Sequence, residues 1–100
     1  MEKTLTIDGK EVRFRSTGAT PLRYKAQFGK DYFAELMKMG SLESAMKGDA
    51  EALAAFDFEG LYKIVWTLAK TADKDIPEHM EWLDQFDEFP LFDIFMELQD

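Results

Sequence analysis

One segment of this chain, residues 58–72, constrains the fold more than any other. Its apolar residues recur with the i, i+3, i+4, i+7 spacing of one helix face, which Ile64 and Leu68 widen further. Because a helix that is apolar over most of its circumference has to be surrounded, we expect it to be the central helix of the core. The apolar face consists of Phe58, Leu61, Tyr62, Val65, Trp66, Ala69 and Ala72. The narrow polar strip that remains consists of Glu59, Lys63, Thr67 and Lys70.

The N-terminal residues predict a β-hairpin. Apolar and polar side chains alternate along residues 4–7 and again along residues 11–15, which is the period of half-buried strands. Asp8-Gly9 between them tolerates the positive φ angles of a two-residue type I′ turn. We therefore expect a hairpin over about residues 3–16. Because an isolated hairpin is only marginally stable, its apolar side must pack on helices or its edge must pair with another subunit.

Helix-start and helix-stop signals divide the next part of the chain. Thr20-Pro21 is typical of an N-cap followed by proline in the first turn, and Gly29 suits a C-cap or a kink. Asp31 can restart the helix, with Phe33, Leu36 and Met37 as its apolar stripe. Two short helices or one kinked helix over about residues 20–39 both fit this pattern.

Three further helices are expected, over about residues 49–73, 78–87 and 90–99. The first begins at Asp49 or Asp57, and the other two follow Pro77 and Pro90. Residues 41–50 have weak periodicity and are expected to be a connector or a short helical turn. With 100 residues, the chain suffices for one core. We expect a single domain over residues 1–100, of the α+β class: a mainly helical bundle with an N-terminal two-stranded β-hairpin.

The charge of the chain is acidic and unevenly distributed. The net charge is −8, yet residues 1–40 contain eight Lys and Arg against five Asp and Glu, whereas residues 41–100 contain four against fifteen. An acidic protein is repelled by phosphate backbones and anionic lipid, so neither nucleic acid nor a membrane is an expected partner. The opposite charges of the two parts favour a homo-oligomer in which the basic part of one copy meets the acidic part of another.

No constellation of catalytic or metal-binding residues is visible in the sequence. The chain has no cysteine, and its one histidine, His79, has no second histidine at ligand spacing and is expected to be structural. Asp84, Asp87 and Glu88 do not have the spacing of a calcium loop. The glycines form no phosphate-binding loop. We expect no enzymatic activity, no catalytic residue, no metal and no cofactor.

The acidic C-terminal third contains the candidate partner-binding residues. Residues 73–100 combine ten carboxylates and one lysine with five aromatic rings, whereas disordered acidic tails are poor in aromatics. Phe86 and Phe95 are expected to be core residues. Trp82 and Phe92 lie off the main helical stripe, and Phe89 precedes a proline that disfavours a helical conformation. Because large aromatics dominate interface energetics, Trp82, Phe89 and Phe92 are the candidate anchors for a partner.

Taken in order, several short segments give the chain a resemblance to a known family. The sequence resembles the tail assembly chaperones of long-tailed phages and prophages of low-GC Gram-positive bacteria, over nearly its whole length. The segments are Ile7-Asp8-Gly9-Lys10, Phe14-Arg15-Ser16-Thr17, Pro21-Leu22-Arg23-Tyr24, Phe28-Gly29-Lys30-Asp31, Leu61-Tyr62, Trp66-Thr67-Leu68-Ala69-Lys70, Ala72-Asp73-Lys74 and Glu81-Trp82-Leu83-Asp84.

The resemblance implies a helper of virion assembly that works in the host cytoplasm. Such a protein binds the tape-measure protein, keeps its long hydrophobic helices from aggregating, recruits tail-tube subunits and is not retained in the mature virion. It also implies self-association, and a short product beside a longer frameshifted one. The family has no catalytic residues to carry over. The N-terminus does not resemble a signal peptide, so we expect a soluble, unsecreted protein.

Two other functions remain open at this point. An acidic DNA mimic or antirepressor would inhibit a nucleic-acid-binding protein, and the net charge fits this function. The basic side chains among residues 1–40, however, reduce the likeness of the surface to a phosphate backbone. A small head–tail connector would instead be incorporated into virions. The neighbouring genes distinguish these functions: a large tape-measure gene downstream favours the chaperone, and a restriction or repressor locus favours the mimic.

Overall fold

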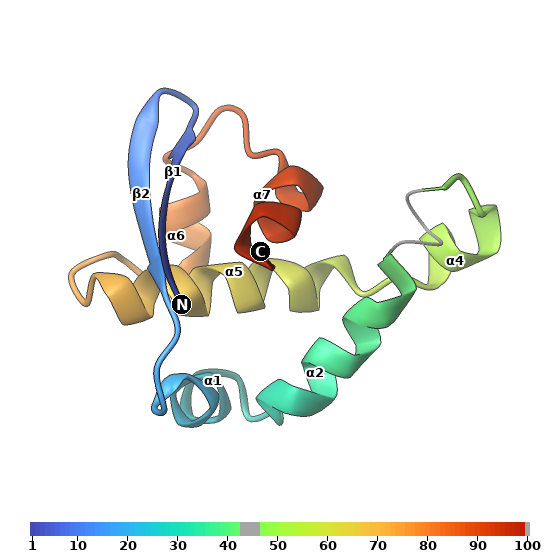
Figure 1. Ribbon diagram of the computed structural model, residues 1–100, viewed down its shortest axis with the longest axis horizontal. Coiled ribbons are helices and arrows are strands. Elements are labelled where there is room, and N and C mark those ends of the chain that lie inside the picture. The colour runs from blue at the N-terminus through green and yellow to red at the C-terminus, as the bar shows by residue number, and fades with distance from the viewer. Residues whose placement is uncertain (43–46, 100) are drawn as a thin grey trace.

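The computed structural model describes residues 1–42 and 47–99 and confirms the expected fold class. A two-stranded antiparallel hairpin precedes a mainly helical body (Figure 1). The strands are β1 (Glu2–Ile7) and β2 (Lys10–Arg15). The helices are α1 (Thr20–Phe28), α2 (Tyr32–Lys38), the short 3-10 helix η1 (Met39–Ser41), α4 (Ala50–Ala55), α5 (Phe58–Ala72), α6 (His79–Leu83) and α7 (Leu91–Leu98).

The hairpin has the expected turn and register. Asp8 and Gly9 have φ angles of 52° and 75°, as a type I′ turn requires. Leu5 therefore pairs with Val12, and Ile7 pairs with Lys10 at the turn. Side chains on one face of the hairpin, Ile7 among them, are directed into the core.

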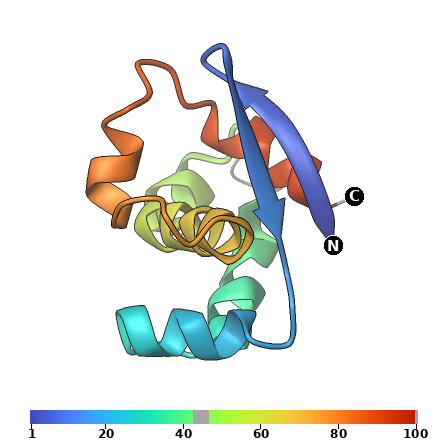
Figure 2. The same cartoon turned by 90° about the vertical axis from the view of Figure 1, so that its left-hand side faces the viewer.

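Helix α5 is the centre of the core, as its sequence predicts. Leu61, Ile64 and Val65 are each completely buried. Figure 2 shows α5 nearly end-on, with the hairpin on one side, α6 on the other and α1 below. The α7 helix also packs on α5, through a face that includes Ile94 and Phe95. Thr67, assigned to the polar strip by periodicity, is buried too, and its hydroxyl donates to the Lys63 carbonyl at 2.7 Å.

Two separate helices, α1 and α2, occupy the region predicted as two helices or one kinked helix. Gly29 adopts a left-handed conformation at φ 73° and ends α1, while the Asp31 carboxylate accepts hydrogen bonds from the backbone N–H groups that open α2. The predicted N-cap at Thr20 is wrong by one residue. Ala19 occupies the cap position, and the Thr20 hydroxyl accepts from the Thr17 backbone N–H at 2.9 Å.

The predicted apolar stripe of α2 is wrong for its outer members. Phe33 is 61% exposed and Met37 is 82% exposed, whereas Tyr32 and Glu35 are buried against the body. The cap at Asp31 sets where the helix begins, and contacts with α1 and with the start of α5 then decide which side faces inward. A stripe drawn from apolar residues alone does not include Glu35, which the fold buries.

The helix expected over residues 49–73 is broken into α4 and α5. Asp49 caps the first, and the Asp57 carboxylate caps the second by accepting from the Gly60 N–H at 2.9 Å. Phe56 between them has an extended backbone. Both of the alternative start sites in the sequence are therefore used. Residues 43–46 of the connector expected over residues 41–50 lie outside the described residues, which resume at Lys47 with a turn.

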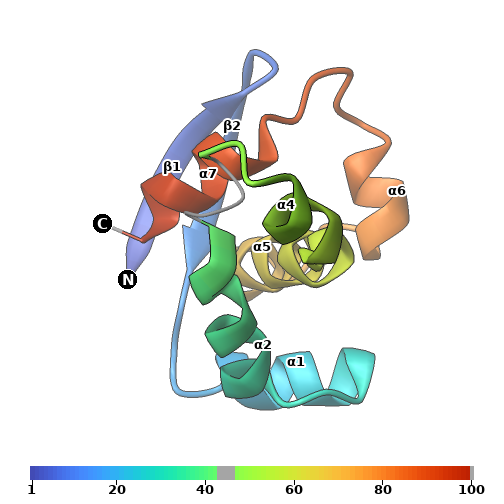
Figure 3. The same cartoon turned by 90° about the vertical axis from the view of Figure 1, so that its right-hand side faces the viewer.

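The two C-terminal helices are shorter than expected, and residues 84–90 form a long connection between them (Figure 3). Backbone groups of the segment from residue 73 to residue 90 are bound to the rest of the body. The Trp66 indole donates to the Pro77 carbonyl at 3.0 Å, and the Asp87 N–H donates to the Asp8 carboxylate at 2.9 Å. The Lys10 ammonium donates to the Gln85 carbonyl. These bonds attach the segment to the hairpin and to the middle of α5, and a groove lies between α6 and the first half of α5.

Candidate functional site: an aromatic groove between α5 and α6

The groove is an open hollow of about 640 Å³ with an apolar floor. One wall is the first half of α5, and the other is α6 with the connection that follows it. Met80 is 60% exposed and Phe58 36% exposed, so apolar surface is accessible to a partner. The lining residues are Phe58, Glu59, Tyr62, Lys63, His79, Met80, Leu83, Phe86, Asp87 and Phe89.

Phe89 lies in the groove because proline follows it. The residue is outside both neighbouring helices, which confirms the predicted loop conformation, and its ring is half-buried. The ring centroid lies 6.0 Å from that of Tyr62 on α5 and 5.4 Å from that of Phe86. Phe89 thus contacts both walls of the groove, Tyr62 on α5 and Phe86 on the connection that follows α6.

Phe92 extends the aromatic surface beyond the groove. Its ring, half-buried on the first turn of α7, lies 5.6 Å from that of Phe58 and 6.0 Å from that of Phe56. Phe58 also lines the groove. The cluster around Phe92 and the groove therefore share Phe58 and form adjoining parts of one aromatic surface.

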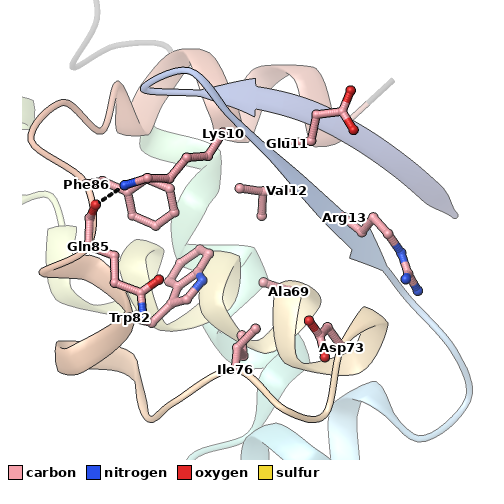
Figure 4. A pocket seen from close by; sticks show the side chains of 10 residues that line it. All are labelled: Lys10, Glu11, Val12, Arg13, Ala69, Asp73, Ile76, Trp82, Gln85 and Phe86. Atoms are coloured by element: carbon pink, nitrogen blue, oxygen red, sulfur yellow. Dashed lines mark hydrogen bonds between the residues drawn. The ribbon is translucent and has the colours of Figure 1, made fainter.

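Trp82 is not on this surface. It is only 3% exposed, and its ring packs against those of Phe86 and Phe89 at 5.2 and 5.6 Å. The indole lines a separate small cavity beneath β2 (Figure 4). Of the three candidate anchors, the structure brings Phe89 and Phe92 to the accessible aromatic surface, while Trp82 supports Phe89 from the core side.

Met80, Leu83 and Phe58 also belong to the groove, although the sequence analysis named none of them as partner-binding and placed Phe58 on the face of the central helix. A signal was present for the first two. They are spaced i, i+3 in a short segment flanked by acidic residues, so the apolar side of that helix is too small to form a core face by itself. For Phe58 no sequence signal distinguishes the end of α5 from its buried middle.

Comparison of the chain with protein-family models, with curated proteins and with solved structures finds no match. The groove must therefore be interpreted from its own chemistry and from the sequence resemblance. Within the described residues, no helix is both long and apolar enough to cross a membrane.

The rim of the groove is acidic. Glu59 and Lys63 form an ion pair at 2.8 Å, and the hydrogen bond from Lys63 lowers the pKa of the Glu59 carboxyl. The Lys63 ammonium also lies 5.1 Å from the centre of the Phe28 ring, which contributes a cation–π contact. Because this lysine is already paired, its charge does not offset Asp87 at the rim.

His79 closes the groove at the start of α6. Its imidazole packs edge-on against Phe28 and Trp66, with ring centroids 5.3 and 6.0 Å away. A carboxylate oxygen of Glu78 lies 3.2 Å from Nδ1 of His79. The Glu78 carboxylate also accepts a hydrogen bond from the backbone N–H of Glu81, which lowers the pKa of the Glu78 carboxyl. These contacts favour a structural role for His79. Within residues 1–42 and 47–99, no group of three potential metal ligands comes together.

The cavity beneath β2, of about 220 Å³, carries charges of both signs (Figure 4). Lys10 donates to the Gln85 carbonyl, and Arg13 donates to the Ala72 carbonyl at 2.8 Å. The two cations therefore connect the hairpin to the carbonyl groups on the far side of the cavity. This arrangement stabilises the fold, and the groove remains the better candidate for binding.

Proposed function

We propose that this protein is a non-enzymatic tail assembly chaperone of a long-tailed phage or prophage. In this function it binds the tape-measure protein in the host cytoplasm, keeps it from aggregating, recruits tail-tube subunits and is absent from the mature virion. The sequence resemblance supports the identity of the client. The accessible aromatic groove with an acidic rim supports the binding activity, and it is the observation on which the proposal most depends.

The client segment that suits this groove is an amphipathic helix. Helices bind grooves through apolar anchors spaced i, i+3, i+4 and i+7, and the exposed Met80 and Phe58 offer contacts for such anchors. Asp87 at the rim favours lysine or arginine beside the client's apolar stripe. A tape-measure protein has long helices whose apolar stripes need cover before the tail assembles, so reversible contacts of this kind fit the task.

Co-expression with the tape-measure protein encoded in the same genome tests the proposal. The wild-type chain should be recovered with the client and should keep it soluble. Phe89→Ala should weaken the complex by at least about thirtyfold if the ring is a hot spot, as measured by titration calorimetry with a purified client fragment.

Met80→Glu tests the same groove without disturbing the core, because the side chain is 60% exposed. Met96→Glu on α7 is its matched control, since Met96 is 50% exposed and lies outside the groove. Met80→Glu should weaken client binding and Met96→Glu should not. A tape-measure protein that is equally soluble alone and forms no complex would contradict the proposed function.

A further inference from the structure

The cavity beneath β2 contains a hydrogen-bond donor that has no acceptor. Trp82 is only 3% exposed, and its ring lines the cavity together with Phe86 and Ala69 (Figure 4). None of the described residues accepts a hydrogen bond from its indole N–H. The indole of Trp66, by contrast, donates to the Pro77 carbonyl at 3.0 Å. Because the N–H of a buried tryptophan usually has a partner, Trp82 offers an unused donor to a molecule bound in the cavity.

The indole nitrogen of Trp82 can be reached from the cavity. It is not one of the fully enclosed polar atoms without a partner, so the small accessible part of this residue includes its donor. In Figure 4 the nitrogen lies on the side of the ring nearer Ala69, and Gln85 lies on the other side. The donor is therefore held by a buried ring and directed toward the space below the strand.

The cavity has an apolar floor and a rim of balanced charge. Val12 and Ile76, both half-buried, complete the floor beside the two aromatic rings. Two cations and two carboxylates, all on exposed residues, form the charged part of the lining: Lys10, Glu11, Arg13 and Asp73. Because the lining has no net charge and the floor is apolar, an uncharged ligand loses less hydration on entry than an ion does.

Hydrogen bonds across the cavity fix its walls. Lys10 donates to the Gln85 carbonyl, and its ammonium lies 5.1 Å from the centre of the Phe86 ring. Arg13, further along β2, donates to the Ala72 carbonyl at 2.8 Å. The strand is thus tied to both segments that face it, so the cavity is formed before any ligand enters, as is usual for small-molecule sites.

The volume and the shape of the cavity limit the size of a ligand. It measures about 220 Å³, and an apolar cavity of about 150 Å³ is enough for one benzene molecule. One six-membered ring with a short substituent therefore fits. The rings of Trp82 and Phe86, 5.2 Å apart and inclined by 76°, provide two adjoining aromatic walls for such a ring.

We propose that this cavity binds a small, uncharged aromatic molecule that carries a carbonyl oxygen. The ring of the ligand packs against Trp82 and Phe86, and its carbonyl oxygen accepts a hydrogen bond from the Trp82 indole N–H. The site goes beyond the proposed function, because its ligand is a small molecule and not a helix of another protein. Among the described residues, Phe86 alone lines both this cavity and the groove, so the site is tested without any client.

Acetophenone and α-methylstyrene are matched probes, because the second has a CH₂ group where the first has its carbonyl oxygen. NMR of ¹⁵N-labelled protein follows the two indole N–H groups separately. Acetophenone should shift the Trp82 signal in a saturable way and leave the signal of Trp66, which is already hydrogen-bonded, in place. α-Methylstyrene should bind about fivefold more weakly, as expected for the loss of one hydrogen bond.

Trp82→Phe keeps an aromatic ring and removes the donor. In this variant acetophenone should lose its preference, so that the two probes bind with equal affinity, as followed by the backbone amides that line the cavity. Val12→Phe fills the cavity from a half-buried strand position and should prevent the binding of both probes. Met96→Phe is its matched control on α7, outside the cavity, and should bind both probes like the wild type.

The two probes on the wild-type chain give a decision even if a variant is destabilised. A Trp82 signal that does not move up to the solubility limit of acetophenone would overturn the proposal. Equal affinity of the wild type for the two probes would overturn it as well, because the carbonyl oxygen would then contribute nothing. A folded Trp82→Phe protein that still prefers acetophenone would show that another group donates the hydrogen bond and would contradict the site as assigned.

Discussion

At the scale of single residues, Trp82 shows how burial changes the role of an aromatic side chain. The sequence offered it as a partner anchor, but its ring is 3% exposed and supports the rings of Phe86 and Phe89. Its contribution to binding is therefore expected to be indirect, through the position of Phe89. A buried supporting residue is best distinguished from an anchor by measuring stability and affinity separately.

Trp82→Ala should destabilise the protein by about 3–5 kcal/mol, because it removes a buried indole and leaves a cavity. For a domain of this size, that corresponds to a fall in Tm of more than about 10 °C in thermal unfolding. Phe92→Ala, at a half-buried ring, is the comparison and should cost less. A Trp82→Ala protein with wild-type Tm would contradict the buried position.

Gly60 is the other residue on which the local structure depends. A Cβ atom at this position would lie 2.5 Å from the Asp57 carboxylate oxygen Oδ2 and 3.0 Å from Oε2 of Glu35. The Asp57 carboxylate caps α5, and the Glu35 carboxylate lies buried beside it. Burial and the nearby Glu35 charge also raise the pKa of the Tyr24 hydroxyl in this part of the core. Glycine thus permits the close approach of α2 to the start of α5.

Gly60→Ala should reduce the free energy of unfolding by about 1–2 kcal/mol, since crowding of the cap outweighs the better helix propensity of alanine. The effect should shrink when Asp57→Ala has already removed the crowding carboxylate, which a double-mutant cycle in urea would measure. Stabilisation by Gly60→Ala in the wild-type background would show that the cap tolerates the methyl group.

At the scale of elements, α4 and α5 differ sharply although the sequence predicts one helix across both. No residue of α4 is buried, whereas most of α5 is. The extended Phe56 and the cap at Asp57 separate the two helices, so little couples their stability. Local opening of α4 therefore leaves the core intact.

Amide hydrogen exchange should detect this difference directly. Amides of Leu61 to Ala69 in α5 should exchange only through openings whose free energy approaches that of global unfolding, because these residues form the centre of the core. Amides of α4 should exchange by local fluctuation, orders of magnitude faster. Equal protection of both helices would indicate that α4 has a covering partner, and low protection of α5 would contradict its central place.

At the scale of the whole molecule, folding assembles the groove from two segments that are distant in sequence, the first half of α5 and residues 79–89. Any second molecule bound in this groove would exclude the client from it.

If copies of this chain associate through the groove, a tape-measure fragment that binds it should shift the protein toward smaller species by mass action. Sedimentation of a fixed protein concentration with increasing fragment would show this shift. The Met96→Glu variant should behave identically, because Met96 lies outside the groove. Client binding that leaves self-associated species intact would place the client and the self-association contact on different surfaces.

The sequence by itself determined the features that depend on neighbouring residues. The hairpin turn at Asp8-Gly9, the left-handed Gly29, the cap at Asp31 and the central position of α5 all follow from local backbone preferences or from a long, strong periodicity. These forces act over a few residues along the chain, so they can be seen in the sequence alone.

Only the tertiary structure decided which sides of the short helices face the core. Glu35 is buried while Met37 is exposed, and Trp82 is buried while Met80 is accessible, because tertiary contacts orient helices too short to have a clear apolar face. Of the candidate site, Phe89 followed from its proline, whereas the groove itself did not. Its walls come from α5 and from residues 79–89, and the 73–90 segment is fixed by bonds to the hairpin and to Trp66, partners that are distant from most of it in sequence and adjacent only after folding.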